Sequence, residues 1–326
     1  MKNDLDKLAK RIEAKHGFRI GKKIYQANYY RGKQPRNAIF LGSYRGKKAA
    51  LKIYDDPRES DEPLALARFN KINKSKILAA PELYKYEVFS AKRGWLIMER
   101  LPAGARAFTS PLAEKARSEF IKVFLEYRKI FPSRPQRKLT LAERLPPEKF
   151  HLYRINRWLA LAHSHEAESG QVILKANEFN DRFAKATAII EKEFANRKMI
   201  WCHGHFKPPE IFKTTAGKYY LTDFAHSNLY PEGYEFAFII WADYIMAADW
   251  RQNYGKWKKG INDLTKELRP VAGKLGIKKY DQLMKASLLE RALGTILADI
   301  CATDKPKKEK IMRTKLLYKL IDDLTK

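Results

Sequence analysis

The sequence contains few cysteines and no long uninterrupted apolar run. Its two cysteines, Cys202 and Cys301, lie far apart among 326 residues, which argues against a disulfide scaffold and for a reducing compartment. No signal peptide precedes them, so we expect a cytoplasmic protein. The longest apolar stretch, 236–248, contains Asp243 and is shorter than the about 20 apolar residues that a membrane-spanning helix needs. We therefore expect a core helix there and no transmembrane segment.

The sequence is also poor in acidic residues relative to basic ones. It has 65 Lys and Arg against 37 Asp and Glu, which gives a formal net charge of +28. Such a charge attracts phosphates, nucleic acid and anionic membrane surfaces, and it disfavours cationic ligands. We expect basic patches around 134–138 and 305–310, although a spread of charge that serves only solubility stays open. The length and a hydrophobic content of 45% indicate a globular protein of one large domain or two lobes.

The first third of the chain lacks a glycine-rich phosphate motif but is rich in strand patterns. Alternating hydrophobicity predicts strands over 24–30, 37–44, 48–54, 82–89 and 94–100. An amphipathic helix predicted over 4–15 precedes them, and we expect it to dock on this domain. The turn at 31–36 has one glycine and three cations, and its backbone N–H groups could still hold phosphate.

A lysine and a glutamate in this region are predicted to form an ion pair. Lys52 lies in an apolar strand segment, which suggests a cation directed into a cleft. A helix is predicted over 58–71, and Pro63 is tolerated only in its first turn. Glu62 is therefore the preferred partner of Lys52, with Glu59 as the second candidate. Both glutamates would also be favourable charges at a helix N-terminus.

The remainder of the chain is predicted to be mostly helical. Amphipathic spacing indicates helices over 113–130, 153–165, 176–194 and 286–302, and a final helix with a basic outer face after residue 303. Residues 131–150 are rich in proline and basic residues and are predicted to form an ordered connection. A strand-rich region followed by a helical one is typical of the α+β class.

The most informative segment is 199–227. Short strands are predicted at 199–202, 211–213 and 219–222, with a turn at 215–217 between the last two. Between the first two strands the sequence reads His203-Gly204-His205-Phe206-Lys207-Pro208-Pro209-Glu210, and Asp223-Phe224-Ala225 follows the third. The pattern is therefore strand, polar loop, strand, turn, strand and aspartate.

This pattern resembles the catalytic and metal-binding loops of the aminoglycoside phosphotransferase and choline kinase branch of the protein kinase-like superfamily. The resemblance implies a bilobal α+β fold with a small antiparallel-sheet N-lobe and a larger, mostly helical C-lobe. The implied divisions are an N-terminal helix at 1–17, the N-lobe at 18–101 and the C-lobe at 102–326. The C-lobe would carry the catalytic-like loop 203–210 and the metal loop 223–225.

The resemblance also implies which residues bind the nucleotide. Residues 49–54 match the strand whose lysine contacts the α and β phosphates and pairs with a helix glutamate, here Lys52 and Glu62. Residues 96–102 match the hinge strand, where backbone groups bond the adenine, so Glu99 and Leu101 are the expected contacts. The implied cofactors are ATP and Mg²⁺.

Two positions of the catalytic loop depart from the family pattern. His205 stands where the family has its catalytic Asp, and Glu210 stands where it has a metal-binding Asn. Asp223 with Glu210 would supply the oxygen ligands that magnesium prefers, while His205 could accept a hydroxyl proton. Lys207 matches a lysine that contacts the transferred phosphate. We therefore expect His205, Lys207 and Asp223 to be catalytic, and His203 to be structural.

The expected function is an ATP-dependent phosphotransferase that transfers the γ-phosphate to a hydroxyl of a small-molecule or surface-bound acceptor. The net charge favours an anionic acceptor. The alternative is a catalytically impaired pseudokinase that binds RNA, anionic lipid or an acidic protein. A zinc site of Cys202, His203, His205 and His226 is disfavoured, because the first two would face opposite sides of a strand.

Overall fold

A computed structural model describes residues 4–28, 34–57, 59, 61–131, 134–135 and 138–326. The chain divides into two compact units. Unit 1 comprises 1–109, 113–137 and 201–228, and unit 2 comprises 110–112, 138–200 and 229–326. Unit 1 thus exceeds the predicted N-lobe, because it also holds a helix and the segment that contains the predicted catalytic and metal loops. The lobe boundaries themselves stay a prediction.

Unit 1 is built on a five-stranded antiparallel sheet in the order β1-β2-β3-β6-β5. Its strands are β1 (Phe18–Asn28), β2 (Pro35–Tyr44), β3 (Lys47–Asp55), β5 (Leu83–Val88) and β6 (Arg93–Glu99). The five predicted strands are therefore confirmed, although β1 begins earlier than the predicted residue 24. Part of the predicted phosphate-binding turn, 31–33, lies outside the described residues.

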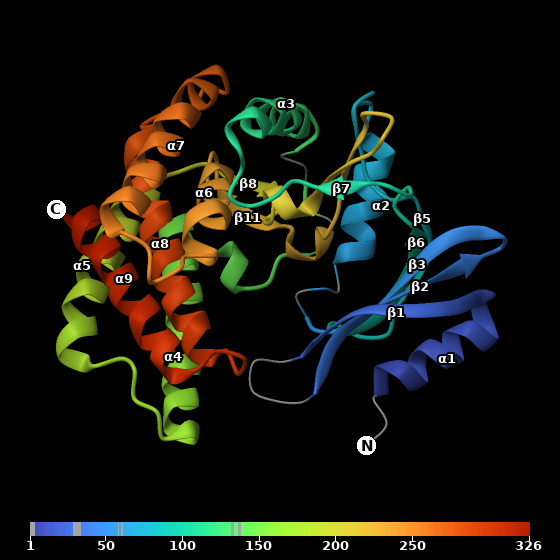
Figure 1. The fold of residues 1–326 in the computed structure, drawn as a ribbon, viewed down its shortest axis with the longest axis horizontal. Helices are drawn as coiled ribbons and strands as arrows, with labels where there is room; N and C mark the ends of the chain where they lie inside the picture. Colours follow the sequence, from blue (N-terminus) through green and yellow to red (C-terminus); the bar gives the residue numbers. More distant parts are fainter. Residues whose placement is uncertain (1–3, 29–33, 58, 60, 132–133, 136–137) are drawn as a thin grey trace. The chain divides into compact units, whose positions relative to one another are not determined.

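Helix α1 (Asp4–His16) lies along one face of this sheet (Figure 1), as its amphipathic pattern predicted. Leu5, Ala9 and Ile12 are buried in one cluster with Leu51 and Ile53 of β3. Successive side chains of a strand point to opposite faces. The even-numbered residues of β3 therefore point to the face opposite α1, and Lys52 is one of them.

Helix α2 (Glu62–Ile72) begins four residues later than predicted. Asp61 is its N-cap, and Pro63 lies in the first turn as expected. Two turn hydrogen bonds precede the helix, from the Glu59 N–H to the Asp56 carbonyl and from the Glu62 N–H to the Glu59 carbonyl. These turns bring Glu59 and Glu62 to the same helix N-terminus.

The remaining strands and one helix complete unit 1. A four-stranded sheet has the order β4-β10-β9-β7, and helix α3 (Glu114–Ile130) belongs to the same unit. The four strands are β4 (Leu78–Ala79), β7 (Arg106–Ala107), β9 (Ile211–Lys213) and β10 (Tyr219–Leu221). Strands β8 (Met199–Cys202) and β11 (Asn228–Pro231) form a two-stranded sheet. A boundary between the two units along the chain falls within each of these strands.

Unit 2 is helical, which confirms the predicted α+β class with its N-terminal antiparallel sheet. Helices α4 (Pro147–Ser169), α5 (Ala176–Phe194), α8 (Tyr280–Cys301) and α9 (Lys307–Thr325) pack against one another (Figure 1). Helix α8 is central, and most of its side chains are buried. The unit also contains a 3₁₀-helix η1 (Ala142–Arg144), α6 (Glu235–Ile240), a π-helix η4 (Trp241–Met246) and α7 (Tyr254–Lys274).

In this unit one predicted helix is present and one predicted basic surface run is partly buried. The core helix predicted at 236–248 is present as α6 followed by the π-helix, whereas α7 was not predicted. The basic run 305–310 is not wholly a surface patch, because Lys310 is buried and donates to the Ile300 carbonyl at 2.8 Å. None of the helices in the described residues is both long enough and apolar enough to cross a membrane.

Candidate active site

Lys52 lies among three carboxylates of unit 1. Its Nζ is 2.6 Å from Glu62 Oε2, 2.8 Å from Glu59 Oε2 and 3.6 Å from Asp223 Oδ1. The predicted Lys52–Glu62 ion pair is therefore present, and the second candidate, Glu59, pairs with the same ammonium group. Asn37 also donates to Glu59, from the neighbouring strand β2. The lysine thus joins the sheet, helix α2 and the segment after β10.

Burial and the neighbouring carboxylates act in opposite directions on the pKa of Lys52. Burial lowers the pKa of Lys52, but Glu59, Glu62 and Asp223 together raise it well above its ordinary value. Burial raises the pKa of Glu62 to about 7 against the opposing effect of Lys52. The ammonium group therefore stays charged near neutral pH. A buried cation of this kind is stabilised only while its carboxylate partners remain.

The loop from His203 to Glu210 is anchored at its start. The His203 N–H donates to the Tyr127 hydroxyl of α3 at 3.0 Å, and the His203 Nε2 lies 2.8 Å from the Thr222 carbonyl. His203 is fully buried, and burial lowers its pKa to about 3. A neutral, buried histidine that ties two loops together has a structural role, as predicted.

Phe206 anchors the middle of the same loop. It is fully buried and stacks on Tyr127 with 4.3 Å between ring centroids. Phe120 and Phe124, also from α3, contact Phe206 at 5.5 and 5.3 Å. The side chains on either side of Phe206, His205 and Lys207, are therefore held by a backbone that is fixed against α3.

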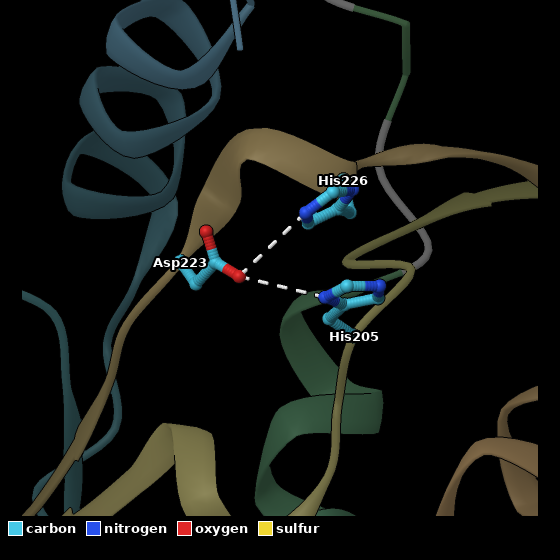
Figure 2. A group of neighbouring side chains, drawn as sticks. All are labelled: His205, Asp223 and His226. Carbon is cyan, nitrogen blue, oxygen red and sulfur yellow. Dashed lines mark ion pairs between the residues drawn. The ribbon is translucent and has the colours of Figure 1, made fainter. Parts of the chain in front are cut away.

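Asp223 lies between two histidines (Figure 2). His205 Nδ1 is 3.4 Å from Asp223 Oδ2, and His226 Nε2 is 3.8 Å from the same oxygen. The two imidazoles stack with 3.7 Å between centroids and 25° between planes. Burial raises the pKa of Asp223, but His205, Lys52 and His226 together lower it well below its ordinary value. Asp223 is thus an ionised carboxylate surrounded by three nitrogen groups.

The backbone of Asp223 is unusual. It has φ 58° and ψ 58°, in the left-handed region that few residues other than glycine adopt. Such a conformation costs on the order of 1 to 3 kcal/mol, and residues that adopt it are enriched at active sites. The 3₁₀-turn η3 (Phe224–His226) follows directly and brings His226 back beside Asp223.

Lys207 and Glu210 form a second ion pair in the loop. Lys207 Nζ lies 3.2 Å from Glu210 Oε1, and the Thr222 N–H donates to the Glu210 carbonyl at 3.0 Å. Burial and the charge of Asp223 raise the pKa of Glu210, while Lys207 lowers it. Within the described residues, the group of three potential metal ligands that lie close together is His205, Asp223 and His226. The predicted metal ligand Glu210 is not in that group.

The predicted hinge contacts lie at the end of β6. The Glu99 N–H donates to the Glu82 carbonyl at 2.8 Å, and the Glu99 carboxylate accepts from the Tyr220 hydroxyl at 3.4 Å. Leu101 follows the strand, and across the described part of the chain no acceptor receives its backbone N–H. That N–H is therefore available to a ligand.

Sequence reasoning did not assign His226 to this site. His226 entered only the disfavoured zinc set of Cys202, His203, His205 and His226. Cys202 and His203 are not part of the group that the structure brings together, and His203 instead bonds the Thr222 carbonyl. The signal that could have identified His226 is its position three residues after Asp223, which a single 3₁₀-turn converts into proximity.

Comparisons with solved structures identify the fold of this chain. No family model matches the chain, and no curated protein does. Among solved structures, aminoglycoside phosphotransferase APH(4)-Ia is 13% identical, with 98% of each chain covered and a TM-score of 0.57. Plasmodium vivax ethanolamine kinase is 13% identical over 97% of this chain and 85% of that one, with a TM-score of 0.58. Choline kinase LicA from Streptococcus pneumoniae is 13% identical over 98% and 99%, with a TM-score of 0.58.

By name, these three proteins are an aminoglycoside phosphotransferase, an ethanolamine kinase and a choline kinase. The chain described here has their fold over nearly its whole length, which confirms the resemblance that the loop motifs indicated. At this level of identity the similarity defines the fold and leaves the chemistry to be argued from the site.

Proposed function

We propose that this chain is an ATP-dependent phosphotransferase that transfers the γ-phosphate to a hydroxyl of an anionic small-molecule or surface-bound acceptor. The observation that carries the proposal is the Lys52–Glu62 pair, with Asp223 Oδ1 3.6 Å from the same ammonium group. In kinases a strand lysine paired with a helix glutamate holds the nucleotide phosphates beside a metal-binding aspartate. Here all three side chains meet within unit 1.

The nucleotide contacts follow from this arrangement. Lys52 would bind the α and β phosphates, and the backbone of Glu99 and Leu101 would bond the adenine. The available N–H of Leu101 supports the latter assignment. APH(4)-Ia has been solved with ADP and hygromycin B bound, and with AMP-PNP and hygromycin B. That protein thus binds adenine nucleotides on the same fold.

Mg²⁺ would be held by Asp223 with Glu210 as its companion. Both offer the hard oxygen atoms that magnesium prefers, and their charges influence each other's protonation. The ion would neutralise charge on the transferred phosphate. Lys207, which pairs with Glu210, would contact that phosphate from the loop.

His205 would accept the proton of the acceptor hydroxyl. Its Nδ1 faces Asp223 Oδ2 at 3.4 Å, so a proton on Nδ1 leaves the lone pair on Nε2 as the acceptor. Asp223 would orient the imidazole and stabilise its charged form after transfer, as an aspartate does for a catalytic histidine in hydrolases. In this proposal a histidine, oriented by the metal-binding aspartate, takes the place of the aspartate base of the family.

The net charge of the chain favours one class of acceptor over another. Choline and ethanolamine, which two of the neighbours are named for, are cations at neutral pH. A protein of net charge +28 attracts anions instead. We therefore propose a phosphorylated or otherwise anionic acceptor for this chain.

The test is calorimetric titration with ATP, with and without Mg²⁺. The proposal requires nucleotide binding that Mg²⁺ strengthens. The changed loop positions, His205 and Glu210, favour a second candidate, a pseudokinase that serves as a basic binding module. Nucleotide binding without any measurable transfer would favour that candidate, and no nucleotide binding in either condition would reject the phosphotransferase.

A further inference from the structure

We infer that His205, Asp223 and His226 form a binding site for a divalent first-row transition ion of the zinc type. This site differs from the proposed magnesium site, whose ligands are Asp223 and Glu210. The inference does not rest on the proposed function, because the binding it describes requires no nucleotide.

The distances suit a single ion. One candidate ligand atom from each of the three residues lies within 4.8 Å of the others. Two ligand atoms bound at about 2.1 Å and at a tetrahedral angle are about 3.4 Å apart. His205 Nδ1 and Asp223 Oδ2 already have this separation, and His226 Nε2 is 3.8 Å from the same oxygen. Small side-chain rotations would bring all three onto one ion.

The donor set selects the kind of ion. Two imidazoles and one carboxylate suit zinc and its first-row neighbours, whereas magnesium prefers oxygen atoms alone. Three protein ligands leave further coordination positions open to water or to an oxygen of a ligand. The three side chains are 22%, 26% and 21% exposed, so an ion can reach them from solvent.

The local charge also favours a dication. Asp223 Oδ1 faces Lys52, which Glu59 and Glu62 surround more closely, while Oδ2 faces the two imidazoles (Figure 2). Nearby, Lys207 and Glu210 pair with each other. The carboxylates of this group outnumber its ammonium groups, so a divalent ion between the histidines would reduce the net negative charge.

The backbone holds the three ligands in place before an ion binds. His205 follows a loop start tied to Tyr127 and Thr222, whereas His226 is positioned by the 3₁₀-turn after Asp223. The near-parallel stacking of the two rings directs one nitrogen of each toward Asp223 (Figure 2). Preorganised ligands lose little conformational entropy on binding.

Ion binding and proton acceptance by His205 exclude each other. The proposed catalytic role needs a proton on Nδ1, whereas coordination through Nδ1 needs the lone pair there. A transition ion at this site would therefore compete with that role of His205. Binding and catalysis can be measured separately, so failure of one does not decide the other.

The experiment is calorimetric titration of the full chain with Zn²⁺ in the absence of nucleotide, followed by Co²⁺ absorption spectroscopy. The inference predicts one tight site per chain and visible Co²⁺ bands of a nitrogen- and oxygen-bound ion. Loss of groups that merely support a metal ligand costs about 10- to 100-fold in affinity. His205→Ala and His226→Ala, which remove ligands, should each weaken Zn²⁺ binding on the order of 100-fold or more.

His163→Ala is the matched control, because His163 is an exposed histidine of unit 2 that lies beside one glutamate. It should leave Zn²⁺ affinity unchanged. If a His226→Ala chain does not fold by circular dichroism, His226→Gln tests the same nitrogen ligand. Equal Zn²⁺ affinity in the parent, the His226 variant and the His163 variant would overturn the inference, and so would displacement of Zn²⁺ by an equal concentration of Mg²⁺.

Discussion

Lys52 Nζ of strand β3 lies 2.6 Å from Glu62 Oε2 of helix α2, and both side chains are almost completely buried. A buried cation without its carboxylates, or the carboxylates without their cation, would carry an uncompensated charge. The pair therefore couples the stability of unit 1 to the proposed nucleotide site. Loss of the lysine should be visible in both properties at once.

Lys52→Met should lower the free energy of unfolding by about 3 to 5 kcal/mol, because Glu59, Glu62 and Asp223 lose their shared cation. It should also abolish measurable ATP binding. Urea denaturation and calorimetry measure the two effects. Lys48→Met, at an exposed position of the same strand, is the control and should change both quantities little. A Lys52 variant as stable as this control would contradict the expected role of the pair.

His205→Ala should slow phosphate transfer by roughly 10²- to 10⁴-fold, the usual contribution of a general base. ATP affinity should stay nearly the same, because the imidazole is not among the proposed phosphate or adenine contacts. Single-turnover kinetics and calorimetry give the two values. An unchanged rate would remove His205 from the mechanism. His205→Asp adds a second comparison: a pseudokinase that lacks only its base should gain activity, and a histidine-based enzyme should lose some.

Asp223→Asn should remove the dependence of ATP binding on magnesium. The amide lacks the charge that the ion needs, so titrations with and without Mg²⁺ should coincide. Glu210→Gln should weaken the dependence without abolishing it, since Asp223 is the principal ligand in the proposal. If Asp223→Asn retains the full magnesium effect, the ion is held elsewhere.

The stability of unit 2 should fall in acid through a buried pair. His151 Nδ1 lies 2.8 Å from Glu290 Oε1, and both side chains are buried. Burial lowers the pKa of His151, while the pKa of Glu290, which burial raises, is lowered overall by His151 and two arginines. Each group therefore binds protons more readily in the unfolded chain, so stability falls as pH drops below about 6.5 for His151 and below about 4.5 for Glu290.

The histidine contribution can be isolated by comparison. Below pH 6.5 the free energy of unfolding should decrease by up to about 1.4 kcal/mol per pH unit more in the parent than in His151→Leu. Urea denaturation from pH 7 to pH 5 measures the slopes. His163→Leu, at an exposed histidine, should keep the parent slope. Identical slopes in the parent and the His151 variant would show that His151 is not held neutral in the folded chain.

Two glycine substitutions should have opposite effects on stability. A Cβ at Gly42 of β2 would lie 2.0 Å from the Arg19 carbonyl oxygen of β1, so Gly42→Ala should destabilise the chain by about 1 to 3 kcal/mol. A Cβ at Gly294 of α8 would meet nothing within 4 Å, so Gly294→Ala should stabilise it by about 0.5 to 1 kcal/mol. Thermal unfolding measures both. A stabilising Gly42→Ala would contradict the packing at Gly42, and a destabilising Gly294→Ala would contradict the open space at Gly294.

The pairing of Lys52 with Glu62 could be predicted because its signals are local. An apolar strand fixes which face the lysine occupies, and Pro63 fixes where the next helix starts. Glu59 was only the second candidate partner, because the turns that bring it to Lys52 have no hydrophobic pattern in the sequence. In 199–227, the order of the polar loop and the aspartate also predicted that the loop lies near Asp223. It did not predict that His226 lies there too.

Features that depend on distant packing could not be predicted. The burial of Lys310 requires the Ile300 carbonyl at the end of α8, ten residues away and in another helix. The position of His226 depends on the left-handed backbone of Asp223, a conformation that aspartate tolerates but that its presence in the sequence does not by itself predict. Helix α7 is a different case, because it was not predicted although its pattern is local. Its buried positions, such as Trp257, Ile261 and Leu264, follow helical spacing.

Helix α3 holds the loop through Tyr127 and the aromatic side chains around Phe206, and this has a consequence for which side chains such a loop can carry. The backbone position is set by contacts that do not involve the side chains of His205 or Glu210. Substitutions at these two positions should therefore leave the backbone of the loop in place. A loop anchored in this way can present different side chains at positions 205 and 210 on the same frame.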